Sequence, residues 1–139
     1  MGRVLAVDFG GRRIGVAVSD PLRIIACPLD TLHISSPGEG IRRLVSLCRE
    51  YEIEILIMGY PLGNSGNKTD QTCIVERVIE DLEEKIDIPV IKWDERFTSI
   101  QAADILRSQG IKARDQKGKV DALAARIILQ EYLDSRETV

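Results

Sequence analysis

Hydrophobic and polar positions alternate or run together in a pattern that predicts three strands at the start of the chain. Residues 4–9 and 14–18 are almost continuously apolar, and the Gly-Gly-Arg-Arg segment at 10–13 separates them. A short glycine-containing connection between two apolar runs is typical of a β-hairpin. A third strand is expected over 24–31, towards a sheet edge, because Pro28 has no N–H to donate to a ladder. Three antiparallel strands therefore open the fold.

After residue 35, helix-period and strand-like patterns alternate. Ser36 is expected to cap the first helix, with Pro37 at its first position and Glu39 completing a capping box. The later elements are expected as helix 36–51, strand 53–58, helix 69–86, strand 89–93, helix 98–110 and helix 118–133. This order predicts an α/β fold with a mixed five-stranded sheet, three antiparallel strands and then two parallel ones, flanked by helices.

Length and composition favour a single soluble domain over residues 1–139. Hydrophobic residues make up 44% of the chain and charged residues 29%, which is ordinary for a globular protein. No apolar run approaches the roughly 20 residues of a membrane span. Met1-Gly2-Arg3 leads directly into a strand rather than into a signal peptide, so we expect a cytoplasmic protein with no membrane partner.

Cysteine and histidine usage narrows the possible chemistry. Cys27, Cys48 and Cys73 are odd in number and far apart, so we expect buried, reduced, structural thiols and no zinc site. His33 is the single histidine, which excludes His-rich metal sites. Catalysis, if present, is therefore expected to use carboxylates and a hard metal ion. The net charge of −3 does not indicate a nucleic-acid binder, although a local basic patch can bind alone.

Acidic residues occur where the predicted sheet would bring them together. Asp8 interrupts an apolar strand, on the same face as Val4 and Ala6, and a buried carboxylate is costly unless it has a partner. Glu95 follows the last strand, and Asp121 lies in the first turn of the final helix. Sites in such sheets form at the carboxyl ends of the parallel strands. Converging carboxylates need a cation between them, and Mg²⁺ or Mn²⁺ is the natural one.

Each candidate also has a purely structural interpretation. Asp8 could cap a turn, Glu95 could pair with Arg96 at the surface, and the helix dipole favours an acid at position 121 whatever its function. Asp94 competes with Glu95 for the same role. Asp20, before a proline, is expected in a turn.

Glycines and basic residues near these acids allow two interpretations as well. Gly10 and Gly11 could supply positive φ in the hairpin or cradle a phosphate. The polar loop at 59–68 is either a surface loop or a substrate contact. A basic connector at 107–119 is either solvated surface or a phosphate-binding segment. We predict that Arg13, Arg96 and Lys119 hold substrate phosphates.

Four segments together resemble one known family. They are 8–20 (DFGGRRIGVAVSD), 59–63 (GYPLG), 94–99 (DERFTS) and 119–125 (KVDALAA). In this order they are similar to the YqgF-type nucleases, also called Holliday-junction resolvases, and the resemblance covers essentially the whole chain. It implies an RNase H-like fold and a role in processing the 5′ end of the small-subunit ribosomal RNA precursor.

By this resemblance, Asp8, Glu95 and Asp121 form an acidic triad that is both catalytic and metal-binding, with one or two Mg²⁺ or Mn²⁺ ions. Phe97 and Tyr60 depart from the residues that are commoner in the family, without removing a proposed ligand. The expected partner is structured RNA, with branched DNA as the alternative substrate. Two other functions stay open: a non-catalytic nucleic-acid-binding factor in transcription, and nucleotide binding as in actin-like ATPases. The sequence leaves monomer and homodimer equally open.

Overall fold

The structure, a computed structural model, describes residues 2–63, 65–94 and 117–137. Side chains of residues 117–120 and 136–137 are outside this description. The predicted helix 98–110 and most of the basic connector lie outside the described residues.

The strands form one mixed sheet in the order β3-β2-β1-β5-β6. β1 (Arg3–Phe9) and β2 (Arg13–Ser19) form the predicted antiparallel hairpin. β5 (Ile53–Tyr60) runs parallel to β1, and β6 (Val90–Asp94) runs parallel to β5. The carboxyl ends of β1, β5 and β6 therefore meet at one edge, as the sequence predicted.

The single strand expected over 24–31 was wrong. Two short strands replace it, β3 (Ala26–Pro28) and β4 (Leu32–His33), and both pair antiparallel with β2. Within the described residues the sheet therefore has six strands and not the five predicted. The strand begins late because two backbone N–H groups ahead of β3 donate to the carboxylate of Asp20 instead of to a ladder. β3 ends at Pro28, although the next residue, Leu29, still donates its N–H to the Val16 carbonyl of β2 at 2.9 Å.

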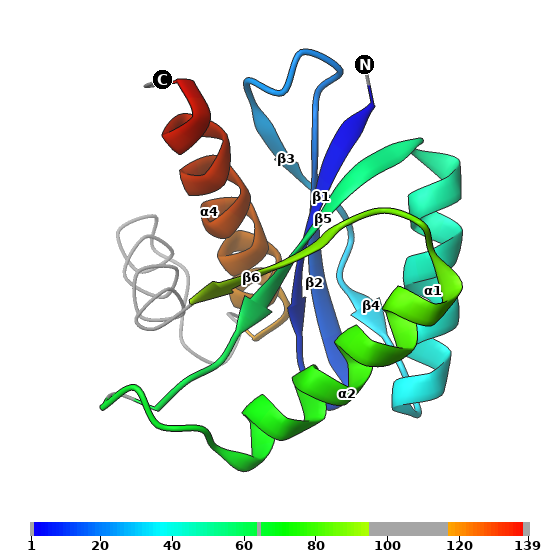
Figure 1. The fold of residues 1–139 in the computed structure, drawn as a ribbon, viewed down its shortest axis with the longest axis vertical. Helices are drawn as coiled ribbons and strands as arrows, with labels where there is room; N and C mark the ends of the chain where they lie inside the picture. The colour runs from blue at the N-terminus through cyan, green and yellow to red at the C-terminus, as the bar shows by residue number, and fades with distance from the viewer. Residues whose placement is uncertain (1, 64, 95–116, 138–139) are drawn as a thin grey trace.

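In the described part of the chain, helices lie on both faces of the sheet (Figure 1). α4 (Lys117–Glu137) lies on one face, and α1 (Pro37–Glu50) and α2 (Asp70–Lys85) lie on the other. The α4 core includes Val4, Ala6, Ala17, Ile57, Ala125, Ile128 and Leu129. The α1/α2 core includes Leu5, Val7, Phe9, Leu44, Leu56, Met58, Val75 and Leu82. Strand alternation thus sends every second side chain to each core. No helix within the described ranges is long and apolar enough to cross a membrane.

Side-chain caps start both α1 and α2. The Ser36 hydroxyl accepts from the Glu39 N–H, as predicted, at 3.2 Å. The Glu39 carboxylate, however, accepts from the N–H of Ser35, one residue before the cap, so the capping box predicted there is not closed. At α2, Thr69 and Thr72 form a reciprocal capping box. These caps fix where each helix leaves the sheet edge.

The three cysteines are all free thiols, but they differ in solvent exposure. Cys48 is buried in α1, and burial raises the pKa of its thiol to about 11 because the thiolate is disfavoured away from water. The prediction that Cys27 and Cys73 are also buried was wrong, since both are exposed. Cys27 lies on the edge strand β3 and Cys73 on the exposed side of α2.

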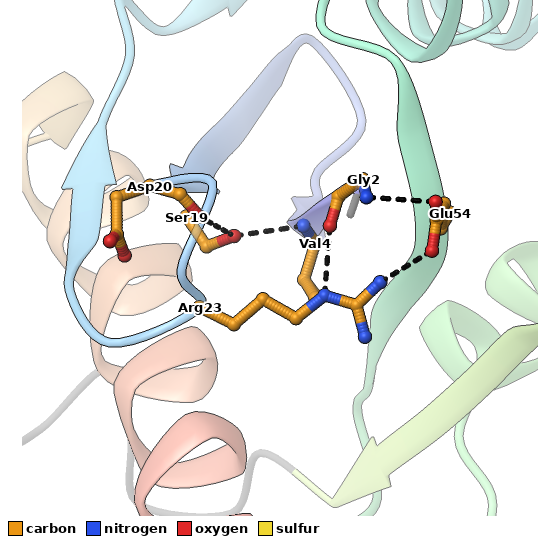
Figure 2. A network of polar contacts seen from close by, with 6 residues as sticks. All are labelled: Gly2, Val4, Ser19, Asp20, Arg23 and Glu54. Carbon is orange, nitrogen blue, oxygen red and sulfur yellow. Dashed lines mark hydrogen bonds and ion pairs between the residues drawn. The ribbon is translucent and has the colours of Figure 1, made fainter.

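A network of polar contacts joins neighbouring strands at the amino end of β1 (Figure 2). The Arg23 guanidinium donates to the Gly2 carbonyl at 2.8 Å and to the Glu54 carboxylate at 2.7 Å. Glu54 also accepts from the Gly2 N–H at 2.8 Å, and the Ser19 hydroxyl accepts from the Val4 N–H at 2.9 Å. The network ties the starts of β1 and β5 to the end of β2, and so fixes the strands that carry the opposite edge.

Asp20 organises the loop between β2 and β3, which confirms its predicted turn role. The pKa of its carboxyl is lowered because the N–H groups of Ile25 and Ile24 donate to the charged form, with a smaller contribution from Leu22. A lowered folded-state pKa stabilises the protein above the ordinary carboxyl pKa of about 3.9, and this stabilisation is lost as the pH falls through the folded value.

We therefore expect Asp20→Asn to lower the free energy of unfolding at pH 7. The difference from the parent should narrow steadily as the pH falls from 5 towards 3, which urea titrations at several pH values would measure. Asp30→Asn, in the exposed segment after β3, is the matched control. A difference that stays constant across this pH range would contradict the assignment.

Candidate functional site

Asp8 lies near the carboxyl end of β1, on the face that α4 covers. Val4 and Ala6 belong to the α4 core, and alternation places Asp8 on the same side, as predicted. The side chain is half-buried rather than fully buried. Across the hairpin, Asp8 pairs with Gly15 of β2. Cross-strand partners share one face of a sheet, so whatever approaches Gly15 there also approaches Asp8.

Gly15 lets the backbone of α4 approach the sheet. A Cβ atom at this position would collide with the backbone carbonyl of Asp121 and would lie 3.0 Å from the N of Ala122. The second turn of α4 therefore rests directly on β2, opposite Asp8. Two of the three predicted acids, Asp8 and Asp121, are thus brought to the same face of the same sheet edge, although 113 positions separate them in the sequence.

Arg13 holds the Asp121 side chain. Its Nε donates to Asp121 Oδ2 at 2.7 Å, and the two side chains are 38% and 21% exposed. Arg13 lies two residues before Gly15 on β2, so it reaches the same face. A charge-assisted hydrogen bond of this length fixes the orientation of the carboxylate. Arg13, predicted as a phosphate ligand, is therefore also the residue that positions Asp121.

The position of Asp121 differs in one respect from the prediction. It was expected in the first turn of the last helix, but α4 begins at Lys117 in the described residues, and its first turn carries no acid. The helix dipole falls off within the first turn, so it contributes less to this carboxylate than the Arg13 ion pair does. The structural interpretation of Asp121 is weakened accordingly.

The remaining predicted residues are only partly visible. Lys119 lies on the first turn of α4, but its side chain is outside the description, and Glu95 and Arg96 are outside it altogether. Within the described ranges, no group of three or more His, Cys, Asp or Glu side chains is placed to hold a metal ion. Two members of the predicted triad are therefore located by the structure, and the third stays a prediction.

Asp94 is placed on the opposite side of the sheet from Asp8. On β6, Ile91 and Trp93 pack towards the α4 core, so alternation turns Asp94 to the α1/α2 face. Register also places it level with Tyr60, at the end of β5. Asp94 therefore lies at the same sheet edge as Asp8 but on the opposite face. This argues against Asp94 as the partner of Asp8, and its rival Glu95 stays the predicted partner.

Of the two interpretations of the hairpin glycines, the structure does not support the one that requires positive φ. The positive-φ glycine of the described chain is Gly66, so neither Gly10 nor Gly11 needs a left-handed conformation. Gly10 is instead in close contact, because a Cβ there would lie 2.6 Å from the Arg13 carbonyl. Its N–H donates to that carbonyl at 2.9 Å. Gly11 has open space around it.

Sequence reasoning missed two residues that shape this edge. Gly15 was treated as part of an apolar strand, although a glycine inside a strand often marks a close approach of another backbone. Gln71, in the first turn of α2, donates from Nε2 to the Phe9 carbonyl at 2.8 Å and so ties the end of β1 to α2. No sequence signal indicated Gln71, because its partner is a backbone atom 62 residues away.

Comparison with known proteins identifies the family. The sequence profile of the RuvX family, described as "Holliday junction resolvase", matches residues 2–135. The chain belongs to the RuvX family. This is the family that the four sequence segments indicated, and the match includes every predicted site residue.

Relatives of this RuvX-family chain span its whole length. A protein of Roseiflexus sp. (strain RS-1), named "Putative pre-16S rRNA nuclease", is 39% identical over 97% of this chain and 96% of its own. A protein of the same name from Dictyoglomus turgidum is 42% identical over 96% of this chain and 94% of its own.

Solved structures share the fold at low sequence identity. RuvC of Thermus thermophilus, in complex with a Holliday junction substrate, gives a TM-score of 0.61 at 14% identity, over 99% of this chain and 96% of that one. The fowlpox virus resolvase, also in complex with Holliday junction DNA, gives 0.56 at 14% identity, over 96% and 98%. The fold is therefore RNase H-like, of the RuvC type, as predicted.

The Arg13–Asp121 pair predicts a modest effect on stability. Arg13→Ala should lower the free energy of unfolding by about 1 kcal/mol, because it removes the ion pair from a carboxylate that is mostly shielded, while solvent screens the more exposed guanidinium. Arg12→Ala, at the exposed neighbouring position, should change it by less than about 0.5 kcal/mol. Urea denaturation of both variants measures the difference, and equal effects would argue against the pair.

Proposed function

We propose that this chain is a metal-dependent nuclease that hydrolyses phosphodiester bonds in the 5′-end processing of precursor 16S ribosomal RNA. The observation that carries the proposal is the contact at Gly15, which brings Asp121 of α4 to the face that carries Asp8. Family membership and the names of the full-length relatives support the same activity. We take residues 1–139 as one nuclease domain, acting on structured RNA in the cytoplasm.

The residues present fit a hard divalent cation. Asp8 and Asp121 offer carboxylate oxygens on one face, and Glu95 is proposed as the third ligand, so the donor set favours one or two Mg²⁺ or Mn²⁺ ions. When bound, such a metal makes water more acidic and stabilises negative charge on the leaving oxygen. The three carboxylates are proposed as both the metal ligands and the catalytic residues.

The protein's own contribution is to hold charges in place before the substrate arrives. Asp8 is carried by a central strand with buried neighbours on both sides, and Asp121 is oriented by Arg13. Groups fixed in this way need little rearrangement during reaction. Arg13, Arg96 and Lys119 are proposed to contact the substrate phosphates, where positive charge offsets repulsion between the carboxylates and the nucleic acid.

Resolution of branched DNA is a second candidate, favoured by the description of the family as Holliday junction resolvases. Nucleotide binding is less well supported. An ATPase-like phosphate cradle needs backbone N–H groups in the hairpin turn, but the Gly10 N–H is already bonded to the Arg13 carbonyl.

A cleavage assay separates these functions. The parent chain is incubated with Mg²⁺ and either a precursor RNA that contains the 16S 5′ leader or a four-way DNA junction, and Glu95→Gln is run in parallel. We expect specific RNA cleavage that EDTA and Glu95→Gln both abolish. Cleavage of the junction alone would favour the resolvase. Binding of RNA without cleavage by the parent would favour the non-catalytic factor.

A further inference from the structure

Tyr60 ends β5 at the same sheet edge as Asp8, but on the other face. Leu56 and Met58 of β5 pack into the α1/α2 core, and alternation turns Tyr60 the same way. The side chain is only half-buried, since the strand runs out beyond the layer of helices. β5 directly neighbours β1 and pairs with it as far as Val7 and Met58, so Tyr60 lies two residues past the last paired position, at the same sheet edge.

One lysine lies over this ring, and a second lies across the bridge that closes the next loop. The Nζ of Lys92, on β6, lies 5.1 Å from the centroid of the Tyr60 ring, and its side chain is exposed. Lys68 is exposed as well, and its Nζ lies 3.3 Å from the Glu76 carboxylate. Glu76 raises the pKa of Lys68, with a smaller contribution from Tyr60, so this lysine stays charged at neutral pH. A half-exposed aromatic ring with a cation over its face is a combination that can bind unpaired nucleotides.

The backbone on either side of Tyr60 is held firmly. Residue 60 is paired with Asp94 in the β5–β6 ladder, and the carbonyl of the next residue, Pro61, accepts from the Thr72 hydroxyl of α2. An isolated bridge joins Leu62 to Lys68 and closes the following loop. A ring presented on a fixed backbone loses little conformational freedom when a ligand stacks on it.

We propose that Tyr60 and Lys92, with Lys68, form a subsite for one unpaired nucleotide of the substrate. The base stacks on the Tyr60 ring in place of the Lys92 ammonium, which moves on its flexible stem to the adjacent phosphate. The inference rests on the proposed nuclease function. When the scissile phosphodiester of the nucleic-acid substrate lies at Asp8, the substrate chain continues across the sheet edge. A base that flanks the scissile bond then reaches Tyr60 on the opposite face. The enzyme therefore selects substrates with an unpaired nucleotide beside the cleaved bond.

Binding without metal tests the subsite independently of cleavage. Fluorescence anisotropy in EDTA measures the affinity for a labelled single-stranded 12-nucleotide RNA, the same RNA in a duplex, and a single-stranded DNA of the same sequence. Tyr60→Leu is expected to weaken single-strand binding about fivefold or more, and duplex binding much less, because only an unpaired base can stack on the ring. Tyr60→Phe should bind like the parent, because the ring face is retained.

A second cation–aromatic pair of the chain provides the control. Arg3 lies over the ring of Tyr51 at 6.0 Å, at the other end of the sheet, so Tyr51→Leu should leave binding unchanged. Lys92→Gln should lower the slope of log affinity against log salt by about 0.7, as expected for one lost phosphate contact on a single strand. Lys85→Gln, in the last turn of α2, should not change this slope.

The outcomes separate this subsite from the proposed function. A folded Tyr60→Leu variant that binds single-stranded RNA and DNA within twofold of the parent would overturn the subsite, even if the parent cleaves RNA. Tyr60-dependent binding by a parent that cleaves nothing would support the subsite and reject the nuclease. Dependence on Tyr60 in the RNA arm alone assigns the subsite to RNA, and dependence in both arms assigns it to unpaired strands of either sugar.

Discussion

Asp8→Asn is expected to reduce metal-dependent cleavage of precursor RNA by about a thousandfold or more while the protein stays folded. Asparagine has nearly the same shape, so the strand and its pairing with Gly15 should survive. The lost negative charge removes one of the proposed metal ligands. Several kcal/mol of transition-state stabilisation go with it, at roughly tenfold in rate for each 1.4 kcal/mol. Initial rates under saturating Mg²⁺ measure the loss.

Two further measurements keep this result specific to the metal site. Titration calorimetry should show weaker Mg²⁺ or Mn²⁺ binding, and anisotropy in EDTA should show RNA binding at least as tight as in the parent, because one like charge has been removed. Asp94→Asn is the matched control, since it changes an acid at the same sheet edge on the opposite face. Because Asp94 is paired with Tyr60, beside the proposed base subsite, the two variants are compared at saturating RNA, where Asp94→Asn should cleave within a few-fold of the parent. An Asp8→Asn variant that cleaves as fast as the parent would remove Asp8 from the site.

Much of the fold could be predicted because the apolar residues within each segment show which of its positions are buried. The nearly continuous apolar run at 4–9 indicated a strand, and most positions of β1 are indeed buried, as is the second half of β5. The third strand could not be predicted correctly. The N–H groups of Ile24 and Ile25 donate to the Asp20 carboxylate and not to a neighbouring strand, so the strand begins after them. A side-chain acceptor and a strand carbonyl compete for the same N–H groups, and the local sequence does not show which of the two wins.

In the candidate site, too, some residues could be predicted from a local sequence pattern and others could not. Asp8 was found because an acid inside an apolar strand is costly, and that cost is visible in one short segment. The Arg13–Asp121 ion pair joins residues 108 positions apart, so no local pattern reports it. Arg13 was chosen for its charge alone. The structure adds that it orients a carboxylate, and that Asp94, equally plausible in sequence, lies on the opposite face.

The two faces of the sheet carry different groups at this edge, and we assign catalysis to one face and base binding to the other. The α4 face carries Asp8, Arg13 and Asp121, the groups proposed for chemistry. The α1/α2 face carries Tyr60 and Lys92, the groups proposed to hold an unpaired base. β1 and β5 are neighbours in a well-buried sheet, so the spacing between the two sets is fixed by backbone hydrogen bonds. Variants on one face should therefore alter binding and catalysis separately.

Gly15→Ala is expected to lower the free energy of unfolding by about 2–4 kcal/mol and to disable the site. The new methyl group collides with the Asp121 carbonyl, a backbone atom that cannot rotate away, so α4 must move off β2. That movement separates Asp121 from both Asp8 and Arg13. Trp93, the single tryptophan of the chain, packs edge-on against Tyr132 of α4 with centroids 5.9 Å apart, so its fluorescence reports the displacement directly.

Gly11→Ala is the control that isolates close contact from glycine loss in general. No atom of the described residues lies within 4 Å of a Cβ at Gly11, and its φ is not positive, so alanine should change stability by less than about 0.5 kcal/mol. Urea titrations, Trp93 emission and RNA cleavage are compared across the two variants. If Gly15→Ala matches Gly11→Ala in all three, then α4 does not rest on β2 at this point. The placement of Asp121 beside Asp8, on which the proposed metal site depends, would fall with that contact.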